Sequence, residues 1–197
     1  MSPRQLRARC QSCGRKVPNY EITRYGSAEN GYRELCTRCI NTEIAESDGL
    51  EGFEHADFAP VKLTDCDGRT HTFHFRTRLF GPGVALDAFE LRDGYPGGYQ
   101  FQIIGEPDDD LMVLLGKLLE RIRRSLAIKH LRKGDLGWQI ADNVVRGKIT
   151  SDLDEEERMP LLIIDGRDVT WHEFGRMLMT FEGWQFKLDI RDKSEEV

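Results

Sequence analysis

The sequence has no apolar run long enough to cross a membrane. Its longest obvious apolar run covers residues 111–115, whereas a membrane-spanning helix needs about 20 such residues. Residues 1–5 lack the apolar stretch of a secretory signal. With 39% hydrophobic and 31% charged residues, the 197-residue chain is typical of a soluble, globular protein. We therefore expect a cytoplasmic protein with no membrane partner.

The sequence also lacks the short motifs that mark common enzyme classes. It contains no phosphate-binding loop, no dinucleotide-binding fingerprint and no nucleophile elbow. His172 and Glu173 begin the pattern of a zinc protease, but the second histidine of that pattern is missing. The sequence therefore assigns no catalytic residue and favours a non-catalytic role over an enzyme.

Cysteine is scarce, and its spacing is informative. Four of the five cysteines form two C-x-x-C pairs, Cys10 with Cys13 and Cys36 with Cys39, and Cys66 stands apart. An odd number of cysteines in a chain without a secretory signal argues against a disulfide framework. We therefore expect free thiols.

The two cysteine pairs predict one zinc site. Thiolates three residues apart can turn onto the same ion, and zinc prefers four such ligands in a tetrahedron. Cys10, Cys13, Cys36 and Cys39 would then hold one structural Zn²⁺, and no position on the ion would be left for catalysis. A redox-active dithiol and an iron–sulfur centre are the alternatives.

The segments around the pairs predict a small finger. Residues 21–25 and 32–35 are expected to form a hairpin that turns at 26–31, and residues 40–46 a helix. Knuckle, hairpin, knuckle and helix is the order of a treble-clef finger. We therefore expect a treble-clef-like zinc-finger module at 1–46, followed by a linker at 47–57.

An α+β domain is predicted for residues 58–191. Alternation and turn signals predict antiparallel strands at 61–64, 69–80, 84–91 and 99–104. A long helix is expected at 108–133, and a short one after the capping box of Thr170 and Glu173. The remaining expected segments are strands at 144–150, 161–164 and 184–190, an acidic loop at 152–158 and a mobile tail at 192–197. The fold class is thus α+β, a mostly antiparallel sheet packed with one long and one short helix.

One face of the strand at 69–80 carries three cationic or potentially cationic side chains. His74, Arg76 and Arg78 stand two residues apart, so they share one side of the sheet. Together they could hold a phosphate or a carboxylate. The alternative is an ordinary solvated face of a sheet that is covered on one side only.

Charge is unevenly spread along the chain. The net charge is −6, yet residues 1–40 hold eight Lys or Arg against three Asp or Glu. A basic module on an acidic body could bind an anionic partner such as nucleic acid. Alternatively, the positive charge offsets the net negative charge of four thiolates around one Zn²⁺.

Three stretches of the sequence stand out together. They are Cys10–Gly14 with Leu35–Cys39, His74–Arg78, and Ile164–Arg167 with Trp171–Leu188. These stretches resemble a family of uncharacterised prokaryotic proteins that pair an N-terminal zinc finger with a C-terminal α+β domain. The resemblance would cover almost the whole chain, and it implies no activity and no catalytic residues.

These observations lead to competing functions. The first is a zinc-binding adaptor or regulatory protein whose finger recognises a protein or a nucleic acid. The alternative is an enzyme or small-anion-binding domain with a site around His74, Arg76 and Arg78. A third function, as a component of a larger complex, predicts an exposed apolar patch near Trp171 and Trp184. The sequence makes no prediction about the oligomeric state.

Overall fold

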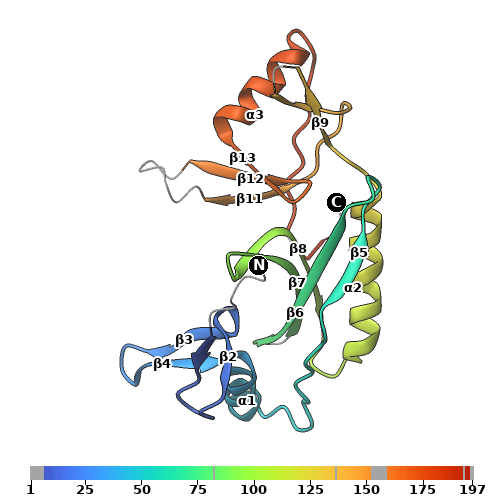
Figure 1. The fold of residues 1–197 in the computed structure, drawn as a ribbon. Coiled ribbons are helices and arrows are strands. Elements are labelled where there is room, and N and C mark those ends of the chain that lie inside the picture. Colours follow the sequence, from blue (N-terminus) through green and yellow to red (C-terminus); the bar gives the residue numbers. More distant parts are fainter. Residues whose placement is uncertain (1–6, 82, 136, 152–158, 193, 196–197) are drawn as a thin grey trace.

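The computed structural model describes residues 7–81, 83–135, 137–151, 159–192 and 194–195. In these residues the chain forms three successive lobes (Figure 1). We name them the N-terminal lobe (residues 7–48), the central lobe (61–126) and the C-terminal lobe (131–181). All strand pairs in the described residues are antiparallel, and helices pack beside them. The predicted α+β class is therefore confirmed.

The N-terminal lobe consists of two small hairpins and a helix. Its elements are β1 (Arg7–Arg9), β2 (Lys16–Pro18), η1 (Asn19–Glu21), β3 (Ile22–Ser27), β4 (Gly31–Cys36) and α1 (Thr37–Asp48). β1 pairs with β2, and β3 pairs with β4. Gly49, with a φ of 65°, ends α1 in the left-handed conformation that favours glycine. The second hairpin and the helix that follows it lie where the sequence predicts them.

The central lobe is a four-stranded meander with one helix. Its elements are β5 (Val61–Thr64), β6 (Thr70–Phe80), β7 (Gly83–Arg92), β8 (Tyr95–Gly105) and α2 (Leu111–Leu126). The strand order β5-β6-β7-β8 confirms the predicted meander. β8 begins earlier than predicted, because Asp93 and Gly94 alone make the turn. Both have positive φ, 52° and 86°, as the tightest hairpin turns require.

The core of the central lobe lies between α2 and one face of the sheet (Figure 1). Leu114, Leu118, Ile122 and Leu126 are buried at intervals of four residues, which places them along one side of α2. They pack against the inner faces of the strands, chiefly Phe73, Phe75, Leu79, Val84, Leu86, Ala88 and Tyr99. In β6 the buried residues alternate with those of the face that carries His74, Arg76 and Arg78.

α2 is shorter than the helix predicted at 108–133. It follows Asp110, whose side chain caps the helix, and it ends at Leu126. The buried positions of α2 recur every four residues up to Leu126. The next such position is His130 and not Leu131, so the apolar side of the helix does not continue. Leu131 instead begins a strand and packs into a different cluster. No helix in the described residues, α2 included, is long and apolar enough to cross a membrane.

The C-terminal lobe combines a hairpin, a three-stranded sheet and a short helix. Its elements are β9 (Leu131–Gly134), β10 (Gly137–Ile140), β11 (Lys148–Ser151), β12 (Pro160–Ile164), β13 (Arg167–Thr170), α3 (Trp171–Leu178) and η2 (Met179–Phe181). The predicted capping box is confirmed, because Thr170 Oγ1 accepts from the N–H of Glu173 at 3.2 Å and the Glu173 carboxylate accepts from the N–H of Thr170 at 2.9 Å.

The central and C-terminal lobes each have an apolar cluster of their own. The buried members of the C-terminal cluster are Leu131, Ile140, Leu162, Ile164, Val169 and Met177. Polar contacts join the two lobes. Arg92 of the central lobe forms an ion pair of 2.5 Å with Asp168 and donates to the carbonyl of Gly166. At the start of the C-terminal lobe, Asp165 accepts from the N–H groups of His130 and Leu131, each at 2.8 Å. Residues 58–191, predicted as one domain, therefore hold two cores.

Residues 184–190 do not form the strand that the sequence predicts. They have no regular secondary structure, and their large apolar side chains are exposed. The alternation is that of a strand, but no neighbouring strand pairs with it in the described part of the chain. β11 is also shorter than predicted, beginning at Lys148. The predicted acidic loop at 152–158 and residues 193, 196 and 197 of the predicted tail lie outside the described residues.

α1 covers the free edge of β6. β5 pairs only with residues 70–73 of β6, so no strand among the described residues lies beside the rest of that edge. Asn41 of α1 takes this place. Its side-chain amide donates to the carbonyl of Thr77 at 2.8 Å, and its side-chain carbonyl accepts from the N–H of Leu79 at 3.0 Å. One side chain therefore satisfies two groups of a buried strand edge.

The segment predicted as a linker, 47–57, is packed against the central lobe. α1 extends to Asp48, and Leu50 and Phe53 contact the central core. Thr77 Oγ1 donates to the carbonyl of Ala56 at 3.1 Å. The N-terminal lobe is therefore coupled to the central lobe through both α1 and the segment that follows it.

Candidate metal centre

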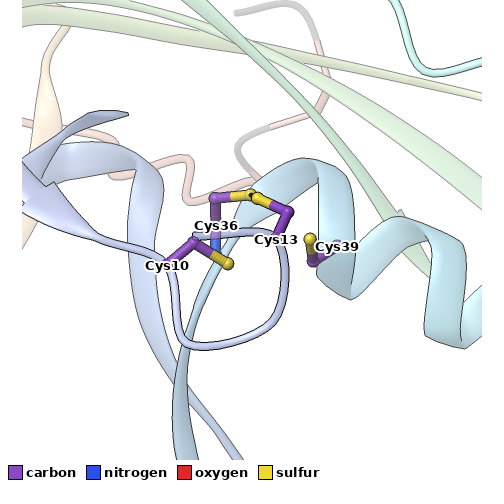
Figure 2. Close-up of side chains that lie close together, drawn as sticks. All are labelled: Cys10, Cys13, Cys36 and Cys39. Carbon is purple, nitrogen blue, oxygen red and sulfur yellow. Dashed lines mark hydrogen bonds between the residues drawn. The ribbon is translucent and has the colours of Figure 1, made fainter. Parts of the chain in front are cut away.

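The four cysteines predicted as metal ligands lie together (Figure 2). Their sulfur atoms are all within 4.8 Å of one another, and the Sγ atoms of Cys13 and Cys36 are 3.8 Å apart. Four thiolates in a tetrahedron, each about 2.3 Å from a central ion, are also separated by about 3.8 Å. The four sulfurs could therefore hold one metal ion.

The two cysteine pairs reach the site from a tight turn and from the start of a helix. Cys10 follows β1, and the N–H of Gly14 donates to its carbonyl at 3.0 Å. Gly14 has a φ of 70°, which glycine adopts without strain. Cys36 ends β4 and caps α1, and Cys39 lies in the first turn of that helix. The turn and the helix start thus aim all four side chains at one point.

The site combines burial with hydrogen bonds that favour thiolate. The N–H of Cys36 donates to Cys10 Sγ at 3.3 Å, and the positive end of α1 adds to this effect. Hydrogen bonds from the backbone and side chain of Arg15 lower the pKa of Cys13 to about 6. Burial raises the pKa of Cys36 to about 12. The thiols would therefore not all ionise at neutral pH unless a cation stabilised the four thiolates together.

The donor set suits a closed site. Cys10 and Cys36 are buried, Cys39 is half-buried and Cys13 is exposed. An ion held by four thiolates is saturated, so it offers no position to a substrate or to water. Around the sulfurs the lobe has little apolar core, because the buried members of its cluster are Cys10, Leu35 and Cys36. The arrangement can fix the lobe's fold, but it has no open position for catalysis.

His74, Arg76 and Arg78 lie on one face of β6, as predicted, but the arginines already have an anionic partner. The sheet register places Arg76 opposite Asp87 of β7. The Asp87 carboxylate accepts two hydrogen bonds from Arg78, at 2.7 and 3.1 Å, and lies 3.4 Å from the guanidinium of Arg76. Burial raises the pKa of Asp87, but hydrogen bonds from Arg78 and Gln102 hold it below its usual value. An external anion would have to compete with this carboxylate.

The same face of the sheet is covered by η1 of the N-terminal lobe. The carbonyl of Tyr20 accepts from Arg76 at 2.9 Å, and its hydroxyl lies 3.4 Å from His74 Nδ1. The Tyr20 ring packs edge-on against Phe89, which is 2% exposed. The face is therefore partly covered, and Arg78 keeps a side-chain exposure of 36%. The geometry favours an interface between lobes over an anion site.

A second polar cluster, which the sequence did not predict, lies at the other end of β6. His71 Nε2 is 3.0 Å from the Asp65 carboxylate, and Nδ1 is 2.9 Å from the Glu90 carboxylate. Lys129 Nζ lies 2.6 Å from Asp65 and 3.1 Å from the hydroxyl of Tyr99. The carboxylates of Asp65 and Glu90 thus flank the His71 imidazole, and the Lys129 ammonium joins them in a largely buried polar network.

This network holds the segment after α2 against the sheet. Burial raises the pKa of Asp65, but hydrogen bonds from Lys129 and His71 hold it well below its usual range. The members come from positions scattered between 65 and 129, so no motif marks them in the sequence. The available signal was His71, a polar residue on the apolar side of the β6 alternation.

Comparisons with known proteins divide the chain but assign no function. Three family models match successive segments, and each is described as a domain of unknown function: DUF7685 at residues 9–51, DUF7686 at 54–127 and DUF7713 at 130–195. No curated protein and no solved structure matches the chain significantly. The gaps between the matches fall where the three lobes meet. These matches are consistent with an uncharacterised family, as the resemblance implied, but they do not confirm any particular family.

Proposed function

We propose that the protein binds one structural zinc ion through Cys10, Cys13, Cys36 and Cys39 and acts as a non-catalytic binding or adaptor protein. The observation that carries the proposal is the gathering of four sulfur atoms within 4.8 Å of one another. The order of knuckle, hairpin, knuckle and helix around them supports a treble-clef-like finger. A saturated ion of this kind fixes a recognition surface rather than a reaction centre.

The spacing of the sulfurs favours a single metal ion over an iron–sulfur cluster or a redox-active dithiol. An iron–sulfur cluster needs room for several iron and sulfide ions between its thiolates, whereas four sulfurs within 4.8 Å of one another can surround one ion. A redox dithiol needs one pair of cysteines and not a second pair beside it. Four thiolates in a tetrahedron are a common ligand set of structural zinc. Because the thiols are free, we also propose a reducing compartment such as the cytoplasm.

Zinc would supply stability that the N-terminal lobe otherwise lacks. Its apolar cluster has three buried residues, two of them cysteines, against eleven in the central lobe. Zinc binding to such modules contributes about 10–16 kcal/mol at neutral pH, which acts as folding free energy. The ion would therefore stabilise a lobe that is too small to form a large apolar core.

We propose a protein rather than a nucleic acid as the partner. Several arginines of the N-terminal lobe are already occupied within the chain. Arg33 pairs with Glu43 at 2.8 Å, and Arg38 pairs with Asp57 at 2.5 Å. The excess positive charge of residues 1–40 is thereby partly neutralised, and the whole chain carries −6. These contacts weaken the case for a phosphate-binding surface.

Metal analysis of the purified full-length protein tests the zinc site. We expect about one zinc per chain by mass spectrometry of the metal content, and loss of that zinc in the Cys36→Ser variant. The matched control is Cys66→Ser, since Cys66 is exposed and lies outside the cluster. Zinc retained in Cys36→Ser, or absent from the unchanged protein, would refute the site.

Binding to duplex DNA and to RNA tests the choice of partner. Fluorescence anisotropy of labelled duplexes at low salt is expected to show no binding by the zinc-loaded protein. A binding constant that falls steeply as salt increases would move the proposal from a protein partner to a nucleic acid.

A further inference from the structure

The side chain of Asn41 makes a third hydrogen bond, to His55. His55 lies in the segment after α1, and its side chain is only 8% exposed. Asn41 Nδ2 is 2.8 Å from His55 Nδ1 and 2.8 Å from the carbonyl of Thr77. On the far side of the ring, His55 Nε2 lies 3.0 Å from the carboxylate of Asp57. The imidazole therefore lies between the amide that covers the edge of β6 and an acidic side chain.

The backbone of β6 fixes the orientation of the Asn41 amide. The N–H of Leu79 can only donate, so the atom beside it is the amide oxygen of Asn41. The carbonyl of Thr77 can only accept, so the atom beside it is the amide nitrogen. The two hydrogens of that nitrogen then point to Thr77 and to His55. His55 Nδ1 must therefore accept a hydrogen bond, which it can do only in its unprotonated form.

The other ring nitrogen completes the assignment. A neutral imidazole carries one proton, so with Nδ1 unprotonated the proton is on Nε2. There it donates to Asp57, whose carboxylate also accepts from Arg38 at 2.5 Å. His55 is therefore neutral and has one defined tautomer. A second proton, on Nδ1, would point at the amide nitrogen of Asn41, and turning that amide over would break both of its bonds to β6.

We propose that His55 is a pH-sensitive switch at the contact between the N-terminal and central lobes. Neutral His55 holds the Asn41 side chain against the edge of β6, and protonated His55 releases it. Release leaves the carbonyl of Thr77 and the N–H of Leu79 without their partner on α1. The N-terminal lobe is then held less tightly to the central lobe in acid.

The surroundings of His55 favour its neutral form. Burial disfavours the imidazolium most, and it lowers the pKa of His55 even though Asp57 acts in the opposite direction. The positive charges of Arg38 and Arg15 add to the effect of burial. β6 presents Thr77 on this side, which does not titrate. Three carboxylates line the same groove, but in the described part of the chain none is hydrogen-bonded to His55: Glu46, Glu51 and Glu54.

The direction of the pH effect follows from this balance. The closed contact binds the second proton of His55 less readily than the open one does, so protons favour opening. The contact is therefore strongest above about pH 6.5, the usual pKa of histidine, and it weakens as the pH falls below that value. Over about pH 7.5 to 5.5, a histidine of ordinary pKa limits the effect to about tenfold.

Nitrogen NMR of the imidazole side chains in the full-length protein tests the tautomer. At about pH 7.5 we expect His55 Nδ1 to have the chemical shift of an unprotonated, hydrogen-bonded nitrogen and Nε2 that of a protonated one. The opposite tautomer, or two protonated nitrogens, would overturn the proposal. This measurement needs no variant.

Amide exchange of Leu79 tests the switch itself. Corrected for the intrinsic pH dependence of exchange, the protection of Leu79 should fall about five- to tenfold between about pH 7.5 and 5.5. The midpoint should coincide with the titration of His55 followed by NMR. His55→Gln keeps an acceptor for Asn41 and a donor for Asp57 but cannot titrate, so it should lack this fall. His172→Gln, at an exposed position of α3, should keep it.

The metal content is measured at each pH, because acid also protonates thiolates and releases metal. Release of metal would affect the unchanged protein and His55→Gln alike, so the difference between them reports on His55 alone. If the protection of Leu79 varied with pH no more in the unchanged protein than in His55→Gln, the proposal would be overturned. A fall whose midpoint differs from the titration of His55 would overturn it as well.

Discussion

The N-terminal and central lobes achieve burial by different means. In the central lobe, α2 lies on a four-stranded sheet and eleven buried side chains form the core. In the N-terminal lobe, two short hairpins and α1 surround a cluster with three buried residues, two of them cysteines. A small lobe without an apolar core of useful size needs another source of stability. In our proposal a metal ion is that source.

The two lobes are nevertheless not independent. Asn41 completes the edge of β6, and Tyr20 covers the polar face of the sheet. The arginines of that face pair with Asp87, which is 7% exposed. Loss of the metal should therefore reach the central lobe at these contacts while sparing its core.

The largest expected effect is the response to metal loss. With a chelator, or in Cys36→Ser, we expect fast amide exchange throughout residues 7–48, because the lobe loses its proposed source of stability. The amide of Leu79 should also lose protection, because its acceptor is Asn41. The β7 ladder should stay protected. Hydrogen exchange with mass spectrometry measures this pattern, with Cys66→Ser as the control, and an N-terminal lobe that remains protected would contradict the expectation.

The next effect concerns the buried ion network and acid. Asp65→Asn leaves Lys129 without its carboxylate partner, and we expect it to lower the free energy of unfolding by about 3–5 kcal/mol. Because the pKa of Asp65 in the folded protein is held below the value of about 3.9 in the unfolded chain, its stabilisation is complete above that pH. It is lost as the pH falls towards the folded-state pKa.

The difference between Asp65→Asn and the unchanged protein should therefore shrink as the pH falls below about 4. Urea unfolding at a series of pH values measures it. The control is Glu43→Gln, which removes an exposed ion pair with Arg33 and should cost less than about 1 kcal/mol. A difference that does not change with pH would show that Asp65 does not stabilise the fold as an anion.

A core substitution sharpens the comparison between the lobes. Leu118 is fully buried beneath α2, so Leu118→Ala should lower the free energy of unfolding by about 2–5 kcal/mol. The loss should be the same with and without a chelator, because the central core does not include the metal centre. Met112→Ala, at a position 65% exposed on the same helix, should change stability by less than about 0.5 kcal/mol. If the loss of unfolding free energy in Leu118→Ala differed with and without zinc, the two lobes would unfold as one cooperative unit.

The smallest expected effect comes from the contact between the lobes. Asn41→Ala leaves the carbonyl of Thr77 and the N–H of Leu79 without partners, at a cost of about 1–3 kcal/mol. We also expect the melting temperature of the central lobe to respond less to chelator than in the unchanged protein. Calorimetry with and without chelator measures both. Thr42→Ala, at an exposed position of the same helix, is the control. If the melting temperature of Asn41→Ala responded to chelator as strongly as that of the unchanged protein, the lobes would be coupled through other contacts.

Local patterns predicted much of this fold. The alternation of β6 placed His74, Arg76 and Arg78 on one face, the spacing of the cysteines identified the candidate metal centre, and Thr170 with Glu173 identified the start of α3. Each of these signals involves residues close in sequence, so the chemistry of a few positions is enough to predict the structure.

The contacts between distant segments were not predictable in the same way. Nothing local marks Asn41 as the partner of a strand edge or Tyr20 as the cover of Arg76. Leu131 falls within the helix predicted at 108–133, and only the position of the second core shows that it belongs to a strand. The face of His74, Arg76 and Arg78 looked like an anion site because Asp87, its neutralising partner, lies on another strand.

X-ray absorption at the metal edge of the purified full-length protein tests the zinc site most directly. We expect a zinc edge whose fine structure shows four sulfur neighbours at about 2.3 Å and no nitrogen or oxygen neighbour. An iron edge, or zinc with fewer than four sulfur neighbours, would contradict a closed four-cysteine zinc site.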